Sequence, residues 1–227
     1  TLEADGQIDD ITDFDSVTNL DFFGNVVSIG NYIFANTLDM GAVYDVELLA
    51  NLKITSINPD DFWDSRSDNI DTWNDIDADD LSETNAELYS RSTNDDPSGS
   101  PTYGTWEPFA NSTKRGRGFQ FKVEMETSND SQDVVVQTLG VTVKLQRRTE
   151  QQRNISSGTS AKAITFPSAF YSTPSITITA TNMATGDFFE LSSVSRTGFT
   201  ITFKASGGSI VDRNFDYQAV GHGKEIT

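Results

Sequence analysis

The 227-residue chain contains no cysteine, one histidine and three methionines. Without cysteine, a disulfide framework, a Cys-ligated zinc or iron site and thiol chemistry are all excluded. The single imidazole, on His222, is the only one that could serve as a catalytic base, and no Gly-x-Ser-x-Gly motif accompanies it. We therefore expect the protein not to be an enzyme.

The sequence also lacks long apolar runs. No stretch approaches the ~20 apolar residues that span a bilayer, and no basic segment followed by an apolar one resembles a signal peptide. These absences predict a soluble protein with no membrane insertion. Because the sequence begins at Thr1 rather than Met, we expect it to be part of a longer chain.

Basic residues are scarce in one part of the chain only. Residues 1 to 150 hold 29 acidic and 10 basic residues, a net charge of -19, whereas residues 151 to 227 hold 5 and 6, a net charge of +1. So acidic a surface repels nucleic acid and anionic membranes, which argues against nucleic acid as a partner. The contrast predicts two chemically different bodies.

Aromatic and turn-forming residues are plentiful, with 15 Phe, 6 Tyr, 3 Trp and many Ser, Thr, Asn, Asp and Gly. This balance predicts an all-β protein with long polar loops. We expect two β-sandwich modules in tandem. The predicted divisions are an N-terminal arm or linker at 1–25, an acidic β-sandwich at 26–148, a linker at 149–159 and a second β-sandwich at 160–227.

Alternation of apolar and polar residues marks the strands. Phe119, Phe121, Val123 and Met125 alternate with charged or amide side chains, which predicts a strand with one buried and one wet face. Earlier in the chain we expect strands from Val26 onward with breaks at Gly30-Asn31 and Met40-Gly41. Further strands are predicted in the last 70 residues by "KAITFPSAF", "SITITATN", "DFFELSSVS", "GFTITFKAS" and "NFDYQAVGHG".

The segment 58 to 83 is rich in aspartate and holds two tryptophans, which predicts an ordered acidic loop pinned by its aromatic residues. Carboxylate oxygens are the ligands that calcium prefers. Asp75, Asp77 and Asp79 have the spacing of the first three positions of an EF-hand, although the rest of that pattern is missing. Together with Asp71 they are our candidate calcium ligands, and chelation should then lower the melting temperature of the acidic half. No other cofactor is expected.

A basic cluster, Lys114, Arg115 and Arg117, precedes the strand predicted within "RGFQFKVEMETS". We expect it to pair with the acidic loop, in the same subunit or across a subunit contact. Phosphate binding is the alternative.

The closing strand places Phe215, Tyr217 and Ala219 on one face and Asp216, Gln218 and His222 on the other. The first set is expected to be core. The second faces solvent, a neighbouring subunit or a sugar, since polar groups beside exposed aromatic rings recognise saccharide hydroxyls.

Two resemblances to known families follow from motifs in the two halves. The stretches "IDTWNDIDADDL", "AELYSRSTNDDP", "GTWEPF", "RGRGFQFKVEMETSND" and "LGVTVKLQRR" make residues 1 to 148 resemble the C-terminal region of phage tail tip attachment (host specificity) proteins of the J type.

The stretches "AITFPSAFYSTPSITITATN", "VSRTGFTITF" and "RNFDYQAVGHG" make residues 160 to 223 similar to the small β-sandwich of H-type lectins and of C-terminal modules in phage fibres. Tyr217 stands where H-type lectins usually have Trp.

These resemblances imply a homotrimer at the distal end of the phage tail in the virion. Its neighbours would be other phage tail proteins, and it would attach to a host cell-surface glycan or an outer-membrane receptor. A structural trimeric assembly or capping module is the alternative, and a surface-glycan depolymerase is the third hypothesis. The residues expected to contact the ligand are Asp187, Arg196, Asp212, Arg213, Asp216, Gln218 and His222.

Overall fold

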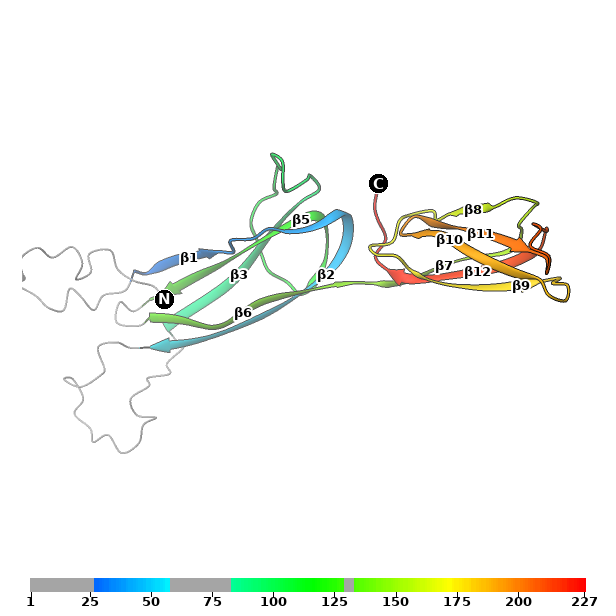
Figure 1. The fold of residues 1–227 in the computed structure, drawn as a ribbon. Coiled ribbons are helices and arrows are strands. Elements are labelled where there is room, and N and C mark those ends of the chain that lie inside the picture. Colours follow the sequence, from blue (N-terminus) through cyan, green and yellow to red (C-terminus); the bar gives the residue numbers. More distant parts are fainter. Residues whose placement is uncertain (1–26, 58–82, 129–132) are drawn as a thin grey trace, which may run out of the picture. The chain divides into compact units, whose positions relative to one another are not determined.

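The computed structural model describes residues 27–57, 83–128 and 133–227. These residues form twelve β-strands and no α-helix (Figure 1), which confirms the all-β prediction. The strands are β1 (Ile29–Ile33), β2 (Leu38–Ile57), β3 (Thr84–Thr93), β4 (Glu107–Pro108), β5 (Ser112–Thr127), β6 (Asp133–Leu145), β7 (Arg147–Ser156), β8 (Lys162–Thr165), β9 (Ser175–Thr181), β10 (Phe188–Ser195), β11 (Gly198–Lys204) and β12 (Asn214–His222). None of the described segments is a helix that could cross a membrane.

The chain divides into two compact units, and neither is a continuous stretch of sequence. Among the described residues, the first unit comprises 27–39, 48–57, 83–112, 118–128 and 133–142, and the second comprises 40–47, 113–117 and 143–227. The long strands β2, β5 and β6 therefore contribute residues to both units.

A six-stranded sheet in the order β4-β3-β5-β2-β6, with β1 also paired to β5, organises the first half of the chain. In β5 the expected alternation is confirmed, since Phe119 and Val123 are fully buried whereas Gln120 and Lys122 are partly exposed. The described residues of the first unit form no second sheet facing this one, so a sandwich there stays a prediction.

The expected strand breaks in the first half are wrong. Strand β1 runs through Gly30, and β2 continues through Gly41, which has a positive φ of 77°. Glycine adopts this conformation at little cost, so the strand bends there without ending. The chain turns instead at residues 34–37, between β1 and β2.

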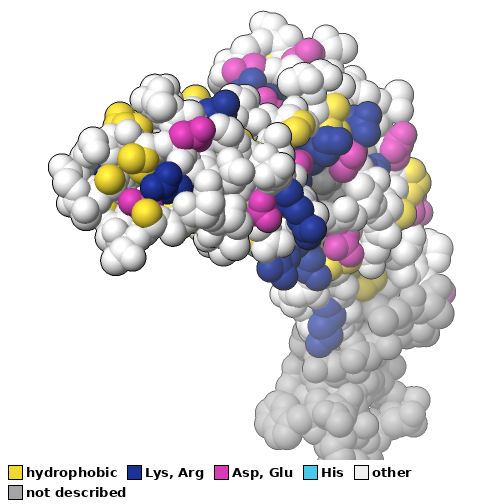
Figure 2. All heavy atoms as spheres, turned by 90° about the vertical axis from the view of Figure 1, so that its right-hand side faces the viewer, with side chains coloured by type: hydrophobic (Ala, Val, Ile, Leu, Met, Phe, Trp, Pro, Cys, Tyr) yellow, Lys and Arg dark blue, Asp and Glu magenta, His cyan; other side chains and the backbone are white. Residues whose placement is uncertain are grey.

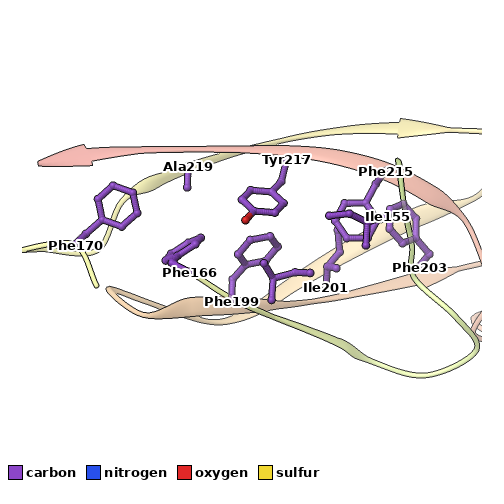
Figure 3. Packing of buried hydrophobic residues seen from close by; sticks show 10 residues of the cluster. Ile155, Phe166, Phe170, Phe199, Ile201, Phe203, Phe215, Tyr217 and Ala219 are labelled. Atoms are coloured by element: carbon purple, nitrogen blue, oxygen red, sulfur yellow. The ribbon is translucent and has the colours of Figure 1, made fainter. Parts of the chain in front are cut away.

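The second unit contains two three-stranded sheets, β10-β11-β8 and β7-β12-β9. Their facing sides form one aromatic core (Figure 3), in which Phe203 contacts Phe215 with ring centroids 5.6 Å apart and Phe199 contacts Tyr217 at 5.3 Å. Phe215, Tyr217 and Ala219 are buried, as period two predicts. Tyr217 is thus a core residue, and burial raises the pKa of its phenol.

The expected linker at 149–159 differs from the structure. Residues 147–156 form β7, which pairs with β12 from Arg147↔His222 to Ser156↔Asn214. Ile155 is 8% exposed and belongs to the aromatic core. The segment has few apolar residues because β7 is an edge strand of its sheet, so sequence polarity alone hides it.

Candidate ligand-binding site

Most side chains that were expected to contact a ligand bind neighbours within the second unit. Asp187 accepts hydrogen bonds from the Arg213 guanidinium at 2.6 Å and from the Ala184 backbone at 2.7 Å, and its side chain is 3% exposed. The backbone donor, helped by the guanidinium, holds the pKa of Asp187 below its usual value. This pair joins the β9–β10 connection to the residue before β12.

Asp212 and Asp216 accept hydrogen bonds from the connection after β7 and from β7 itself. The Asp212 carboxylate accepts from Ser156 Oγ at 2.9 Å and from Gly158 N at 2.8 Å, and these donors lower its pKa. Asp216 accepts from Asn154 N at 2.8 Å. Each carboxylate therefore stabilises local backbone geometry.

The remaining expected residues lie farther along the unit. Arg196 forms an ion pair with Glu225, and its carbonyl accepts a hydrogen bond from Phe170 N. Gln218 and His222 are exposed on β12. Asp216 and His222 are six residues apart on one strand, roughly 20 Å, so the seven residues do not converge on one site.

The predicted calcium ligands Asp71, Asp75, Asp77 and Asp79 lie outside the described residues. Within 27–57, 83–128 and 133–227, no group of three or more acidic, histidine or cysteine residues could hold a metal ion.

Arg115 of the basic cluster pairs with a strand residue, whereas the acidic loop that was expected to pair with the cluster lies outside the described residues, so that pairing stays a prediction. The Nε of Arg115 lies 2.8 Å from Asp45 Oδ1 and its Nη2 3.2 Å from Asp45 Oδ2. The guanidinium fork matches both carboxylate oxygens and lowers the pKa of Asp45. The partner Asp45 lies on β2, 70 residues before Arg115, so the local sequence around Arg115 could not predict this ion pair.

A different group of residues meets on the partly exposed face of the first unit's sheet. We call it the aromatic-cation stack, and it consists of Tyr89, Arg91, Tyr103, Trp106 and Lys122. The Arg91 guanidinium carbon lies 4.9 Å from the centroid of Tyr103 and 4.5 Å from that of Trp106. Lys122 Nζ lies 4.7 Å from the centroid of Tyr89 and 5.6 Å from that of Trp106. The five side chains thus alternate ring and cation.

Strand register explains why these side chains meet. In the β3–β5 pair, Tyr89 stands opposite Lys122 and Arg91 opposite Gln120, all on the face that is not buried. Cross-strand partners in an antiparallel pair lie within contact distance. The two cations are therefore neighbours, and the Trp106 ring contacts both.

Side chains on the neighbouring strand positions hold the two cations of the stack in place. Arg91 Nε donates to Gln120 Oε1 at 2.8 Å, and Gln120 Nε2 donates to Thr37 Oγ1 at 2.9 Å. Lys122 forms an ion pair with Glu124 at 2.8 Å. The guanidinium orientation is thus set by both stacking and a side-chain hydrogen bond.

The connection that carries Tyr103 and Trp106 is held against the sheet. Thr102 N donates to Asp95 Oδ2 at 2.8 Å, and Gly104 N donates to Ser92 O at 3.1 Å. A side chain at Gly118 would meet Pro97 at 2.6 Å, because the connection passes directly over β5 there. Both rings are consequently presented by ordered backbone.

The sequence offered a weak signal for this stack. "GTWEPF" is conspicuous as a turn with Trp106, but its contact with Arg91 and Lys122 depends on the β3–β5 register and on the path of the connection. Neither is encoded in local spacing. Sequence reasoning therefore placed the ligand contacts in the other unit.

An apolar groove of about 440 Å³ also lies on the first unit. It is lined by Asn31, Tyr32, Phe34, Val123, Met125, Val136 and Leu139. With one amide and one phenol hydroxyl among otherwise apolar side chains, it offers few directional contacts. The aromatic-cation stack has the richer polar chemistry for recognising a saccharide.

Comparison with known proteins adds no relatives: no protein-family model, no curated protein and no solved structure matches this chain.

Proposed function

We propose that this protein is a homotrimeric component of a phage tail tip or fibre that attaches the virion to the host cell surface. Its partners are other phage tail proteins and a host glycan or outer-membrane receptor. The resemblances of the two halves and the all-β fold support this proposal. The mechanism is adhesion without catalysis.

The observation that carries the proposal is an apolar edge strand in the second unit. Seven of the eight residues of β10 are exposed, and Phe188, Phe189, Leu191 and Val194 are each 37 to 41% exposed. Exposed hydrophobic side chains also lie among charged ones on the face shown in Figure 2. An exposed apolar edge strand is a surface that another chain covers.

The core-facing side of β10 belongs to this surface. Phe189 stands opposite Phe203 and Leu191 opposite Ile201, two residues that are fully buried in the aromatic core. The Phe189 and Phe203 rings are 5.6 Å apart. Apolar side chains that adjoin the core are therefore exposed at this edge, and contact with a neighbouring subunit would bury them.

The edge strand β7 shows the opposite chemistry. Its core-facing positions include Arg148 and Glu150, which form an ion pair at 3.4 Å. The Arg148 guanidinium lies 3.9 Å from the centroid of the Phe170 ring and so covers the core with a charged group. This edge is closed by its own polar side chains, so β10 is the better candidate for subunit contact.

The occupant that fits β10 is a second copy of the chain. Residues 151 to 227 carry a net charge of only +1, so copies meeting through this part do not repel one another strongly. Three weak receptor sites in one particle then act together, because binding after the first contact is intramolecular.

The mass of the particle in solution tests this assembly. Light scattering after size exclusion should give three times the chain mass of 24.9 kDa. Leu191→Lys should shift the particle toward the monomer, since a charge on an edge strand opposes pairing. Gln151→Lys places the same charge on β7 and should leave the mass unchanged. A wild-type monomer would contradict the proposal.

Binding of fluorescently labelled protein to a panel of bacterial cells tests adhesion itself. The adhesin should label at least one strain. A trimer that labels none would favour the runner-up, a structural assembly or capping module of the tail tip, which the apolar β10 edge supports equally. Cleavage of capsular polysaccharide during long incubation would favour the third hypothesis, a surface-glycan depolymerase.

A further inference from the structure

We propose that the aromatic-cation stack of the first unit binds a saccharide that carries a carboxylate, of the hexuronate class. The inference rests on the proposed function, because it names the chemistry of the receptor glycan. It assigns this contact to the first unit and to residues that were not among the expected ligand contacts.

Arg91 supplies the group that selects the carboxylate. Its Nε is engaged by Gln120 at 2.8 Å, and its guanidinium carbon lies within 5 Å of the ring centroids of both Tyr103 and Trp106. The described residues provide neither a carboxylate partner nor any hydrogen bond for its two terminal nitrogens. A guanidinium held in this way presents a fixed pair of donors, which matches the two oxygens of a carboxylate.

Arg91 differs from Lys122 and Arg115 in having no carboxylate partner among the described residues. Lys122, the other cation of the stack, is paired with Glu124. In the same way Arg115 is paired with Asp45, in the second unit. The guanidinium of Arg91 is therefore not engaged in an ion pair within the described part of the chain. At physiological salt the Debye length is about 8 Å, so acidic residues farther than that from Arg91 oppose the binding of an anion only weakly.

The rings supply the remaining contact. Tyr103 and Trp106 are half-buried, so neither residue is enclosed in the core. The C–H face of a pyranose ring is apolar and packs on aromatic surfaces, while its hydroxyls need polar partners. A sugar resting on these rings would place a ring carboxylate next to Arg91.

The competing explanation is that the stack only fastens the connection with Tyr103 and Trp106 to the sheet. Cation-π contacts contribute to stability with or without a ligand. Selectivity for charge on the sugar separates the two explanations, because a fastening role gives no preference between an acidic and a neutral saccharide.

The experiment is isothermal titration calorimetry of the full chain with galacturonate and mannuronate oligosaccharides and with their methyl esters. We expect at least one acid to bind and its neutral ester to bind about tenfold or more weakly, as loss of a charge-assisted hydrogen bond pair implies. Arg91→Lys, which retains charge and loses the fork, should weaken acid binding by a similar factor. Tyr103→Leu should also weaken it.

Arg115→Gln is the matched control, since it removes one guanidinium elsewhere and should leave affinity unchanged. Melting temperatures of all variants identify loss of fold, and Tyr103→Leu keeps the test decisive where Arg91→Lys is unstable. Absence of binding by both acids, equal binding of acid and ester, or wild-type affinity in folded variants would overturn the inference.

Cell labelling distinguishes failure of the hexuronate inference from failure of the proposed adhesin function. A trimer that labels cells equally well with and without the Arg91→Lys change refutes the stack as the receptor site and leaves the adhesin intact. A wild-type protein that binds hexuronate oligosaccharides and labels no cells retains the binding site and refutes the adhesin.

Discussion

Asp212 joins the end of β7 to the segment before β12 through a single carboxylate oxygen. That oxygen accepts from Ser156 Oγ, from Gly158 N and, at 3.4 Å, from Ser157 Oγ. The donors lower its pKa in the folded protein. The carboxylate therefore stabilises the fold at neutral pH and loses this contribution as the pH falls through the folded-state pKa.

Asp212→Asn keeps an acceptor oxygen but cannot ionise. We expect the melting temperature of the wild type to fall with acidification below about pH 4 and that of the variant to fall less steeply. Thermal unfolding followed by circular dichroism at stepped pH measures both slopes. Asp187 remains as a second such carboxylate, so the slope should decrease without vanishing. Identical slopes would rule out the role given to Asp212.

Substitution of Phe203 tests how much the aromatic core contributes to stability. This residue is fully buried and contacts both Phe189 and Phe215. Phe203→Ala should lower the free energy of unfolding by about 3 to 5 kcal/mol, because a cavity replaces the ring. Ile210→Ala, at a position that is 42% exposed and lies outside both the core and β10, is the control and should change it by less than about 0.5 kcal/mol. Urea denaturation gives both values, and similar losses would contradict the assignment.

At the level of elements, the β8–β11 pairing depends on the absence of a side chain at Gly198. A Cβ there would lie 2.1 Å from the Ile164 carbonyl oxygen on β8. That neighbour is backbone and cannot rotate away, so the strands would have to separate.

Gly198→Ala should therefore destabilise the second unit by about 1 to 3 kcal/mol, the usual cost of overpacking. Gly140→Ala on β6 is the matched control, since nothing lies within 4 Å of its added Cβ. Chemical denaturation compares the two. If the variants are equally stable, close packing of β8 against β11 does not limit position 198.

At the scale of the whole molecule, nearly all of the net negative charge lies in residues 1 to 150. All three tryptophans, at 63, 73 and 106, lie within the acidic residues 1 to 150. Tryptophan fluorescence therefore reports on the acidic part alone, whereas circular dichroism reports on both parts.

We expect the melting temperature recorded by tryptophan fluorescence to rise when sodium chloride increases from about 0.01 M to 0.15 M, since screening reduces repulsion among like charges. Sucrose, which raises stability without ions, is the control for general solvent effects. A salt response no larger in fluorescence than in circular dichroism would show that self-repulsion in the acidic part is unimportant.

Period-two patterns were sufficient to predict β5 and β12 with their buried faces. In both strands one face packs on a core and the other faces water. Apolar residues such as Phe119 and Phe215 therefore alternate with polar residues in the sequence. The polar edge strand β7 and the bend at Gly41 were not predicted, because neither carries such an alternation.

The candidate site depended on information that spacing lacks. The expected ligand residues Asp187, Asp212 and Arg213 were chosen for their polar chemistry, but each finds a partner within its own unit. Arg91 was overlooked because its neighbours Tyr103 and Trp106 are apart from it in sequence and reach it through a connection.

The sequence by itself determined the all-β class, the exclusion of disulfides and thiol chemistry, and the acidic character of one part of the chain. These follow from composition and from alternation, which act residue by residue. Only the tertiary structure decided that β7 belongs to the second unit, that Asp187 pairs with Arg213 and that Arg91 contacts two rings. Such contacts depend on strand register and chain path, because side chains distant in sequence become neighbours only when both are set.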